Sequence, residues 1–157
     1  MPKTVCFTGH RTIPEDQYAR LQMLLDRAIE EQIAHGAVCF RAGGARGFDT
    51  LAALCVLSAR LRHPEIRLEL ILPCPSQSEN WTASEIEVWE RIRAMADDVR
   101  YVSQHFYSGV MHARNRALVD GADFCIAYLT ASRGGTAYTL SYAMKNGVDF
   151  INLADET

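Results

Sequence analysis

The sequence predicts an α/β protein: a doubly wound, mostly parallel β-sheet with helices on both faces. Short apolar runs alternate with longer amphipathic segments along the 157 residues. The apolar runs are nearly continuous, which is typical of strands that are buried on both faces. The order of strand and helix repeats and ends on a strand, as in a parallel sheet covered by helices. With no linker, internal repeat or low-complexity segment, residues 1–157 are expected to form a single domain.

Six strands are expected, each a short run rich in apolar and β-branched residues and bounded by polar or glycine-containing segments. In chain order they are Thr4–Thr8, Ala37–Arg41, Arg67–Leu72, Asp98–Val102, Asp123–Leu129 and Asp149–Leu153. The fifth run, DFCIAYL, is strongly apolar.

The first two helices follow the first two strands. Thr12 and Glu15 have the spacing of a capping box, and apolar residues at helical spacing follow from Tyr18 onward until Gly36 ends the helix. The second helix is expected over Asp49–Leu61, which is rich in alanine and leucine.

Three further helices are expected in the second half of the chain. Thr82 and Glu85 form a second capping box before the helix that contains Trp89. Ser108 can cap a helix that runs to about Asp120. The last helix is expected over residues 135–146, with Gly147 as its stop.

The bulk composition restricts the partners and the compartment. The net charge is −3, so nucleic acid is an unlikely partner, although 16 lysines and arginines can still converge locally. No run approaches the roughly 20 apolar residues that span a bilayer, and no signal peptide is evident. Five cysteines without a CxxC pair indicate a reducing compartment, so we expect a cytoplasmic protein. The histidines lack metal-ligand spacing, so no metal is assigned and no cofactor is expected to be required.

Unusual residues gather at one edge of the expected sheet. Ligands of open α/β sheets bind outside the carboxyl ends of the strands. The segments that follow strands one, two and five at this edge are rich in glycine, hydroxyl and arginine residues, whereas the opposite edge carries ordinary connections. The residues expected to bind a ligand there are Thr8, Gly9, His10, Arg11, Gly43, Gly44, Arg46, Gly47, Asp49, Arg133, Gly134, Gly135 and Thr136.

This chemistry suits a phosphate. Glycines let the backbone approach an anion closely, and two of the glycine-rich loops lead into helices, whose first N–H groups favour negative charge. Arg11, Arg46 and Arg133 lie in or beside the loops and can bind phosphate through two N–H groups at once. Neither GxxxxGK[ST] nor GxGxxG occurs, which argues against a Walker-type loop and against ordinary NAD-dependent dehydrogenase chemistry.

Several of these residues have a structural alternative. Asp49 can bind a ribose hydroxyl or act as a helix N-cap, and Thr136 can contact phosphate or only begin a helix. His10 can serve as an acid or base, although a hydrogen-bonding role is favoured because no partner is evident. Cys74 lacks a base that would make it a nucleophile. Trp81 can stack on a nucleobase or pack beside the helix of Trp89.

In combination, these motifs resemble the SLOG superfamily. Thr8-Gly9-His10-Arg11, Gly43-Gly44-Ala45-Arg46-Gly47-Phe48-Asp49 and Gly134-Gly135-Thr136 carry the likeness, whose order and spacing extend over essentially the whole chain. This Rossmann-like group includes the DprA/Smf proteins, the LOG nucleotide hydrolases and the YpsA-like proteins. The short YpsA-like members are the most similar, and Pro73, Gln77 and Trp81 also look like their third-strand loop.

The likeness to the LOG enzymes implies two further ligand-binding residues, and it shows that a catalytic residue of those enzymes is missing here. These enzymes pair an Arg-Lys helix with a Gly-Gly-x-Gly-Thr-x-x-Glu loop. Arg114 matches the arginine and Asn115 replaces the lysine, so both are implied ligand-binding residues. Thr139 stands where those enzymes have a catalytic glutamate, which argues against hydrolase activity.

The sequence therefore predicts a nucleotide or nucleotide-derivative binding or sensing domain, with a small phosphorylated molecule as its ligand and a homo-oligomer possible. The alternative is a LOG-like phosphoribohydrolase that cleaves the N-glycosidic bond of a nucleoside 5′-monophosphate. Cleavage needs a carboxylate beside an oxocarbenium-like transition state. Asp49 is the candidate, since Asp123 is expected at a strand start, far from the loops.

Overall fold

The computed structural model describes residues 2–156, and they form one six-stranded sheet with helices on both faces. The strands are β1 (Lys3–Gly9), β2 (Ala37–Ala42), β3 (Arg67–Leu72), β4 (Asp98–Tyr101), β5 (Phe124–Tyr128) and β6 (Asp149–Asn152). The helices are α1 (Tyr18–Ala34), α2 (Phe48–Arg62), α3 (Ala83–Met95), α4 (Val110–Val119) and α5 (Gly135–Lys145). All strand pairs are parallel, so the expected fold class is confirmed.

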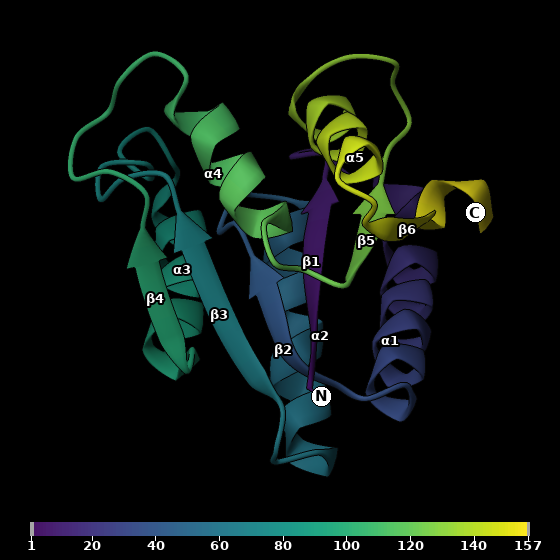
Figure 1. The fold of residues 1–157 in the computed structure, drawn as a ribbon. Helices are drawn as coiled ribbons and strands as arrows, with labels where there is room; N and C mark the ends of the chain where they lie inside the picture. Colours follow the sequence, from purple (N-terminus) through teal and green to yellow (C-terminus); the bar gives the residue numbers. More distant parts are fainter. Residues whose placement is uncertain (1, 157) are drawn as a thin grey trace.

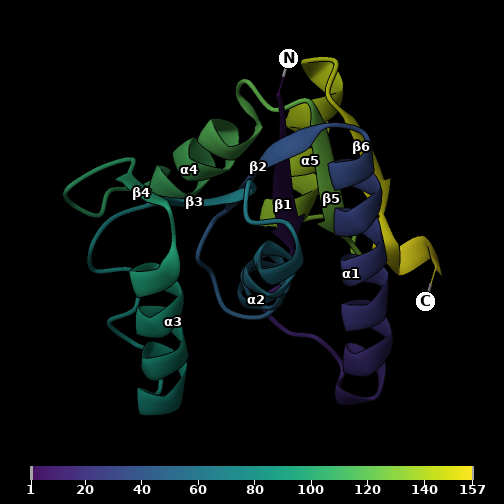
Figure 2. The ribbon, with the colours of Figure 1, turned by 90° about the horizontal axis from the view of Figure 1, so that it is seen from below.

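The strand order places the N-terminal strand inside the sheet and the C-terminal strand at one edge. That order is β4-β3-β2-β1-β5-β6, with β1 at the centre. Figure 2 shows α1, α2 and α3 on one face of the sheet and α4 and α5 on the other. The helices change face because the chain first builds outward from β1 to β4 and then crosses back through α4 to β5 (Figure 1). Right-handed crossovers on the two halves require this arrangement.

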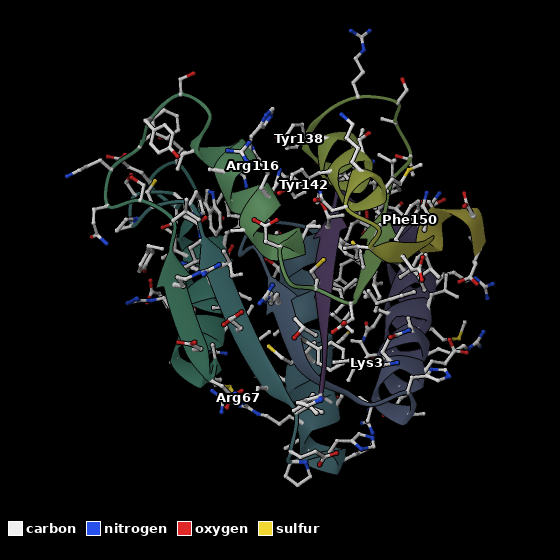
Figure 3. The ribbon with its side chains drawn as sticks, viewed as in Figure 1. Lys3, Arg67, Arg116, Tyr138, Tyr142 and Phe150 are labelled. Atoms are coloured by element: carbon white, nitrogen blue, oxygen red, sulfur yellow. The ribbon has the colours of Figure 1, made fainter. Side chains whose placement is uncertain are left out.

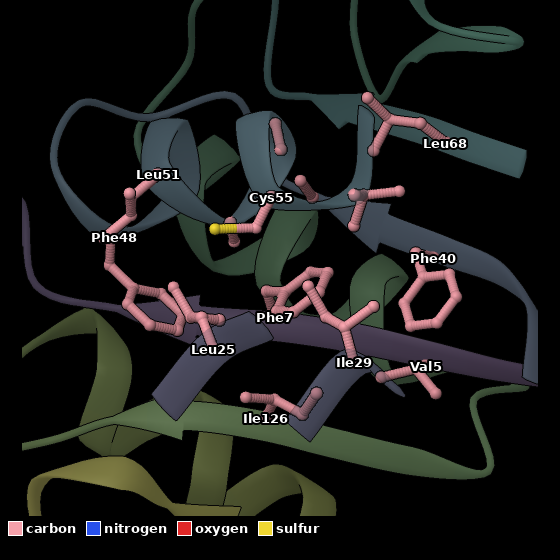
Figure 4. Close-up of a cluster of buried hydrophobic side chains, with 14 of the residues drawn as sticks. Val5, Phe7, Leu25, Ile29, Phe40, Phe48, Leu51, Cys55, Leu68 and Ile126 are labelled. Carbon is pink, nitrogen blue, oxygen red and sulfur yellow. The ribbon is translucent and has the colours of Figure 1, made fainter. Parts of the chain in front are cut away.

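The two faces of β1 belong to two hydrophobic cores. Val5 and Phe7 pack with α1 and α2, and Figure 4 shows Phe7 among Leu25 and Ile29 of α1. Cys6, between them in the strand, faces the smaller core beneath α4 and α5. Because side chains alternate along a strand, β1 must be apolar on both faces, and this is the continuous pattern that the sequence shows.

All five cysteines are free thiols.

Two expected helix starts are wrong. The Thr12–Glu15 capping box does not form, because Pro14 precedes a short 3₁₀ turn at Glu15–Gln17 and α1 begins only at Tyr18, without a side-chain cap. Ser108 does not cap α4 either: Gly109, with φ of 93°, occupies the N-cap and makes no side-chain hydrogen bond. The Thr82–Glu85 capping box is confirmed, with both reciprocal hydrogen bonds present.

Among residues 2–156, no helix combines the length and the apolar character needed to cross a membrane.

Candidate functional site

A cleft of about 790 Å³ opens at the carboxyl ends of β1 and β5. The direction in which the chain adds strands reverses between these two neighbours, because β2 to β4 lie on one side of β1 and β5 and β6 on the other. Open α/β sheets bind ligands at such a reversal point. The volume lies within the range of small-molecule sites, roughly 300–1,000 Å³.

The cleft collects residues from three loops and from the start of α4. The residues expected from the sequence that line it are Thr8, Gly9, His10, Arg11, Asp49, Arg114, Asn115, Gly135 and Thr136. The remaining expected residues, Gly43, Gly44, Arg46, Gly47, Arg133 and Gly134, do not line it. Segments that are far apart in the sequence therefore meet here. The loop after β1 contributes its whole expected set, whereas the loops after β2 and β5 contribute only part of theirs.

The glycines between β2 and α2 make room for the protein's own side chains. A Cβ at Gly43 would lie 2.7 Å from Arg114 Nη1 and 2.9 Å from Asp49 Oδ2. At Gly44, where φ is 74°, a Cβ would overlap Leu72 and lie 2.7 Å from the Trp89 ring. Because Gly43 has no side chain, Asp49 and Arg114 can occupy the wall of the cleft. The absence of a side chain at Gly44 lets the loop pack closely against Leu72 and Trp89 of the core.

One interpretation of the sequence expected Asp49 to be the N-cap of α2, and that expectation is wrong. Gly47 holds that position, with φ of 75°, and Asp49 lies in the first turn, where its Oδ2 accepts from the Ala45 N–H at 3.2 Å. Burial raises the pKa of Asp49 to about 6, although Arg114, the Ala45 N–H and Arg11 each favour the carboxylate. Asp49 is therefore an acid poised near neutrality in the wall of the cleft.

Arg114 is a buried cation in the same wall. It is only 6% exposed, its Nε donates to Asn115 Oδ1 at 2.9 Å, and its Nη1 donates to the carbonyl of Gly43. Burial lowers its pKa, while Asp49 opposes the shift. Arginine stays protonated under ordinary conditions, so the cleft contains a positive charge that little water reaches.

His10 ties the loop after β1 to the loop after β5. Its Nε2 accepts from the Thr130 N–H at 2.8 Å, and its ring meets that of Tyr128 edge to face, with centroids 5.9 Å apart. The Tyr128 hydroxyl in turn donates to Gln17 Oε1 at 2.9 Å. The hydrogen-bonding role favoured for His10 is therefore present, and the ring nitrogen at Nδ1 carries the proton of the neutral form.

The start of α5 forms another wall. Gly134, with φ of 106°, is the N-cap, and Gly135 and Thr136 of the first turn line the cleft. Thr139 is fully buried, and its hydroxyl donates to the carbonyl of Gly135 at 2.7 Å. The Thr139 hydroxyl is therefore hydrogen-bonded within α5. Arg133 is exposed and does not line the cleft.

Contacts between α4 and α5 fix the rim of the cleft. The Arg116 guanidinium donates to the Tyr138 hydroxyl at 2.8 Å, and Figure 3 shows the two side chains near each other at the top of the molecule. On the same tyrosine the His112 ring is stacked, with centroids 4.1 Å apart. His112 also lines the cleft, so this stack anchors one of its edges.

Sequence reasoning missed several lining residues. They are Thr12, Pro14, Gln17, Ala45, Met111, His112, Leu118, Tyr128, Thr130 and Ala131. The tyrosine at the end of the apolar fifth strand was a usable signal, because a polar tip at a strand's carboxyl end faces the ligand edge. No sequence pattern pointed to Gln17, because its position depends on the 3₁₀ turn that precedes α1.

Comparison with known sequences gives a family match. The model of the family described as YpsA, YspA SLOG family, matches residues 6–150. The chain is 28% identical over 139 residues to the uncharacterized SPbeta prophage-derived protein YoqJ of Bacillus subtilis, covering 80% of this chain and 81% of YoqJ. A UPF0398 protein of Halalkalibacterium halodurans is 27% identical over 128 residues, covering 77% of this chain and 68% of that protein.

Two solved structures have a similar fold. The first belongs to DNA processing protein A from Helicobacter pylori, described for its single-stranded DNA binding mode; it has a TM-score of 0.69 at 22% identity and covers 95% of this chain. DNA processing protein A from Streptococcus pneumoniae has a TM-score of 0.65 at 16% identity, again covering 95% of this chain. The matches span only 64% and 49% of those two chains. At these identities the likeness shows the fold alone.

Proposed function

Since this chain belongs to the YspA SLOG family, we propose that it binds a nucleotide or nucleotide derivative in the cleft between β1, β5 and the starts of α4 and α5. The observation that carries the proposal is Arg114. A guanidinium that is 6% exposed, beside the first turn of α5 and the loop after β1, offers a desolvated positive charge to a phosphate. The half-buried His10 ring adds aromatic surface for the nucleoside, and the buried Tyr128 ring packs edge to face against it.

Binding without catalysis is favoured over N-glycosidic cleavage. Thr139, at the position of the LOG glutamate, donates to the helix carbonyl of Gly135 and supplies no charge. Asp49 is the acidic residue that lines the described cleft, and its raised pKa leaves it partly protonated near pH 6. A neutral carboxyl stabilises a developing cation poorly, so Asp49 is a weak candidate for the catalytic residue.

The test is a thermal-shift screen against nucleoside mono-, di- and triphosphates, followed by calorimetry. A ligand at 100 times its Kd stabilises the folded state by about 2.7 kcal/mol. Arg11 is exposed and lines the cleft, whereas Arg133 is exposed and does not, which makes them a matched pair. Arg11→Ala is expected to weaken binding about tenfold and Arg133→Ala to leave it unchanged. No stabilisation by any nucleotide contradicts the proposal.

The fold likeness bears on the expectation that nucleic acid is an unlikely partner. A protein of similar fold from Helicobacter pylori is described by its single-stranded DNA binding, so net charge alone does not exclude this class of partner. A short single-stranded oligonucleotide therefore belongs in the screen. Binding that weakens steeply with salt, and that exceeds binding of the matching mononucleotide, would favour nucleic acid as the ligand.

A further inference from the structure

A second, smaller hollow of about 60 Å³ adjoins the cleft. Arg11, Ala45, Met111 and Arg114 line both spaces, so these four residues form the border between them. The hollow is completed by three residues that the cleft does not use: Arg46, Gln77 and Trp81. They come from the loops after β2 and β3, on the far side of Arg114 from β5.

The hollow is strongly cationic. Three of its seven lining side chains are guanidinium groups, those of Arg11, Arg46 and Arg114. None of the seven is acidic; Glu85 pairs with Arg46 from outside the lining, at 3.7 Å, and Asp49 lies in the adjoining cleft. Like charges that converge in this way repel one another, so an anion is the group that such a hollow accommodates.

Its size selects the kind of anion. A volume of about 60 Å³ is well below the roughly 300–1,000 Å³ of sites that hold a whole small molecule, so the hollow is too small for a nucleoside. A single phosphate group is compact and matches the fork of N–H groups that an arginine presents. The hollow therefore suits one phosphate rather than a nucleoside.

The hollow is already built before any ligand binds. The guanidinium of Arg46 lies over the Trp81 ring, 5.7 Å from its centroid, and Trp81 meets Trp89 edge to face at 6.1 Å. Gln77 donates through Nε2 to the carbonyl of Gly44 at 3.3 Å, a contact that does not use its Oε1. Side chains held in this way lose little conformational freedom on binding, which favours affinity.

We propose that this hollow, named here the side subsite, receives the outer phosphate of a nucleoside diphosphate whose inner phosphate and nucleoside lie in the cleft. The inference rests on the proposed function and narrows its ligand class. Arg11 and Arg114 touch both spaces and so bridge the two phosphates, while Arg46 contacts only the outer one.

The experiment compares 5′-monophosphates and 5′-diphosphates of the four common nucleosides by calorimetry, with wild type and Arg46→Gln. Wild type is expected to bind its preferred diphosphate at least about tenfold more tightly than the monophosphate, and Arg46→Gln to lose that preference while binding the monophosphate as before. Arg91→Gln is the matched control, because Arg91 also pairs with a glutamate, Glu87, but does not line the side subsite.

A second variant guards against a folding defect in the first. Gln77→Glu keeps the size of the side chain and places a carboxylate in the side subsite, so it should also abolish the diphosphate preference. If monophosphates bind but diphosphates bind no more tightly, or if Arg46→Gln weakens both equally, the side subsite is wrong while the proposed function stands. If no nucleotide binds wild type, both proposals are wrong.

Discussion

The Nε2 of His10 accepts a hydrogen bond of 2.8 Å from the backbone N–H of Thr130. Protonation places a second N–H on the ring and removes this acceptor, so the charged ring cannot keep the contact. Burial also lowers the pKa of His10 below its ordinary value of 6.5. The link between the two loops therefore depends on a neutral imidazole.

The first prediction is a loss of stability in mild acid. Between the lowered pKa and 6.5 the unfolded chain binds more protons than the folded one, so the free energy of unfolding falls as pH falls through this window. His10→Gln keeps an acceptor and does not titrate. Urea unfolding from about pH 7.5 to 5.5 should show the stability of His10→Gln rising relative to wild type as pH falls, a difference in which the opposite contribution of Asp49 cancels. An equal pH dependence of the two proteins would remove His10 from the explanation.

Asp49 gives the second prediction, with the opposite sign. Its pKa rises from 3.8 in the unfolded chain to about 6 in the fold, so between these values the folded state binds more protons and loses stability as pH rises. Asp49→Asn lacks this loss. The stability of Asp49→Asn relative to wild type should therefore increase by about 2 kcal/mol from about pH 4.5 to 7, measured by urea unfolding. A difference that does not vary with pH would contradict the raised pKa.

The third prediction concerns two glycines that both have positive φ. At Gly44 an added Cβ would overlap Leu72, whereas at Gly134, with φ of 106°, nothing lies within 4 Å. Gly44→Ala combines backbone strain with overpacking and should cost roughly 3 kcal/mol or more of the free energy of unfolding. Gly134→Ala, its control, adds only strain and should cost roughly 1 kcal/mol. Equal losses would mean that packing at Gly44 is unimportant.

The fourth prediction is that nucleoside 5′-monophosphates are bound but not cleaved. The Thr139 hydroxyl is committed to the carbonyl of Gly135, and no other side chain takes the place of the LOG glutamate in the described cleft except the partly protonated Asp49. Incubation with a panel of monophosphates should release no free base above the rate without protein. Robust turnover that Asp49→Asn abolishes would make the hydrolase interpretation the better one.

Local pattern predicted most of the fold. The six apolar runs and the five helices lie within a few residues of their expected bounds, because buried parallel strands and amphipathic helices each leave a repeating signature. The start of α1 escaped this reasoning. A threonine and a glutamate at capping-box spacing are only a local possibility, and Pro14 between them imposes a different turn.

The location of the site could be predicted from the sequence, but the contacts between its residues could not. The carboxyl edge of the sheet follows from topology, and it brings His10, Asp49 and Arg114 to one cleft. Arg46 shows the limit: it was expected to bind the ligand from a glycine-rich loop, yet it lies over Trp81, which is contributed by a different loop. Such a contact depends on the distance between two strands' loops, which no local pattern encodes.

The pairing of β1 with β5 has a consequence for how the protein folds. Val5 pairs with Phe124, so the pairing of β1 with β5 closes a loop that spans most of the chain. Contacts this distant in sequence form slowly, because the entropy of closing the loop opposes them until other segments are in place. The cleft needs both strands, so ligand binding during refolding should appear with the slow phase. Ligand binding therefore reports that β5 has paired with β1.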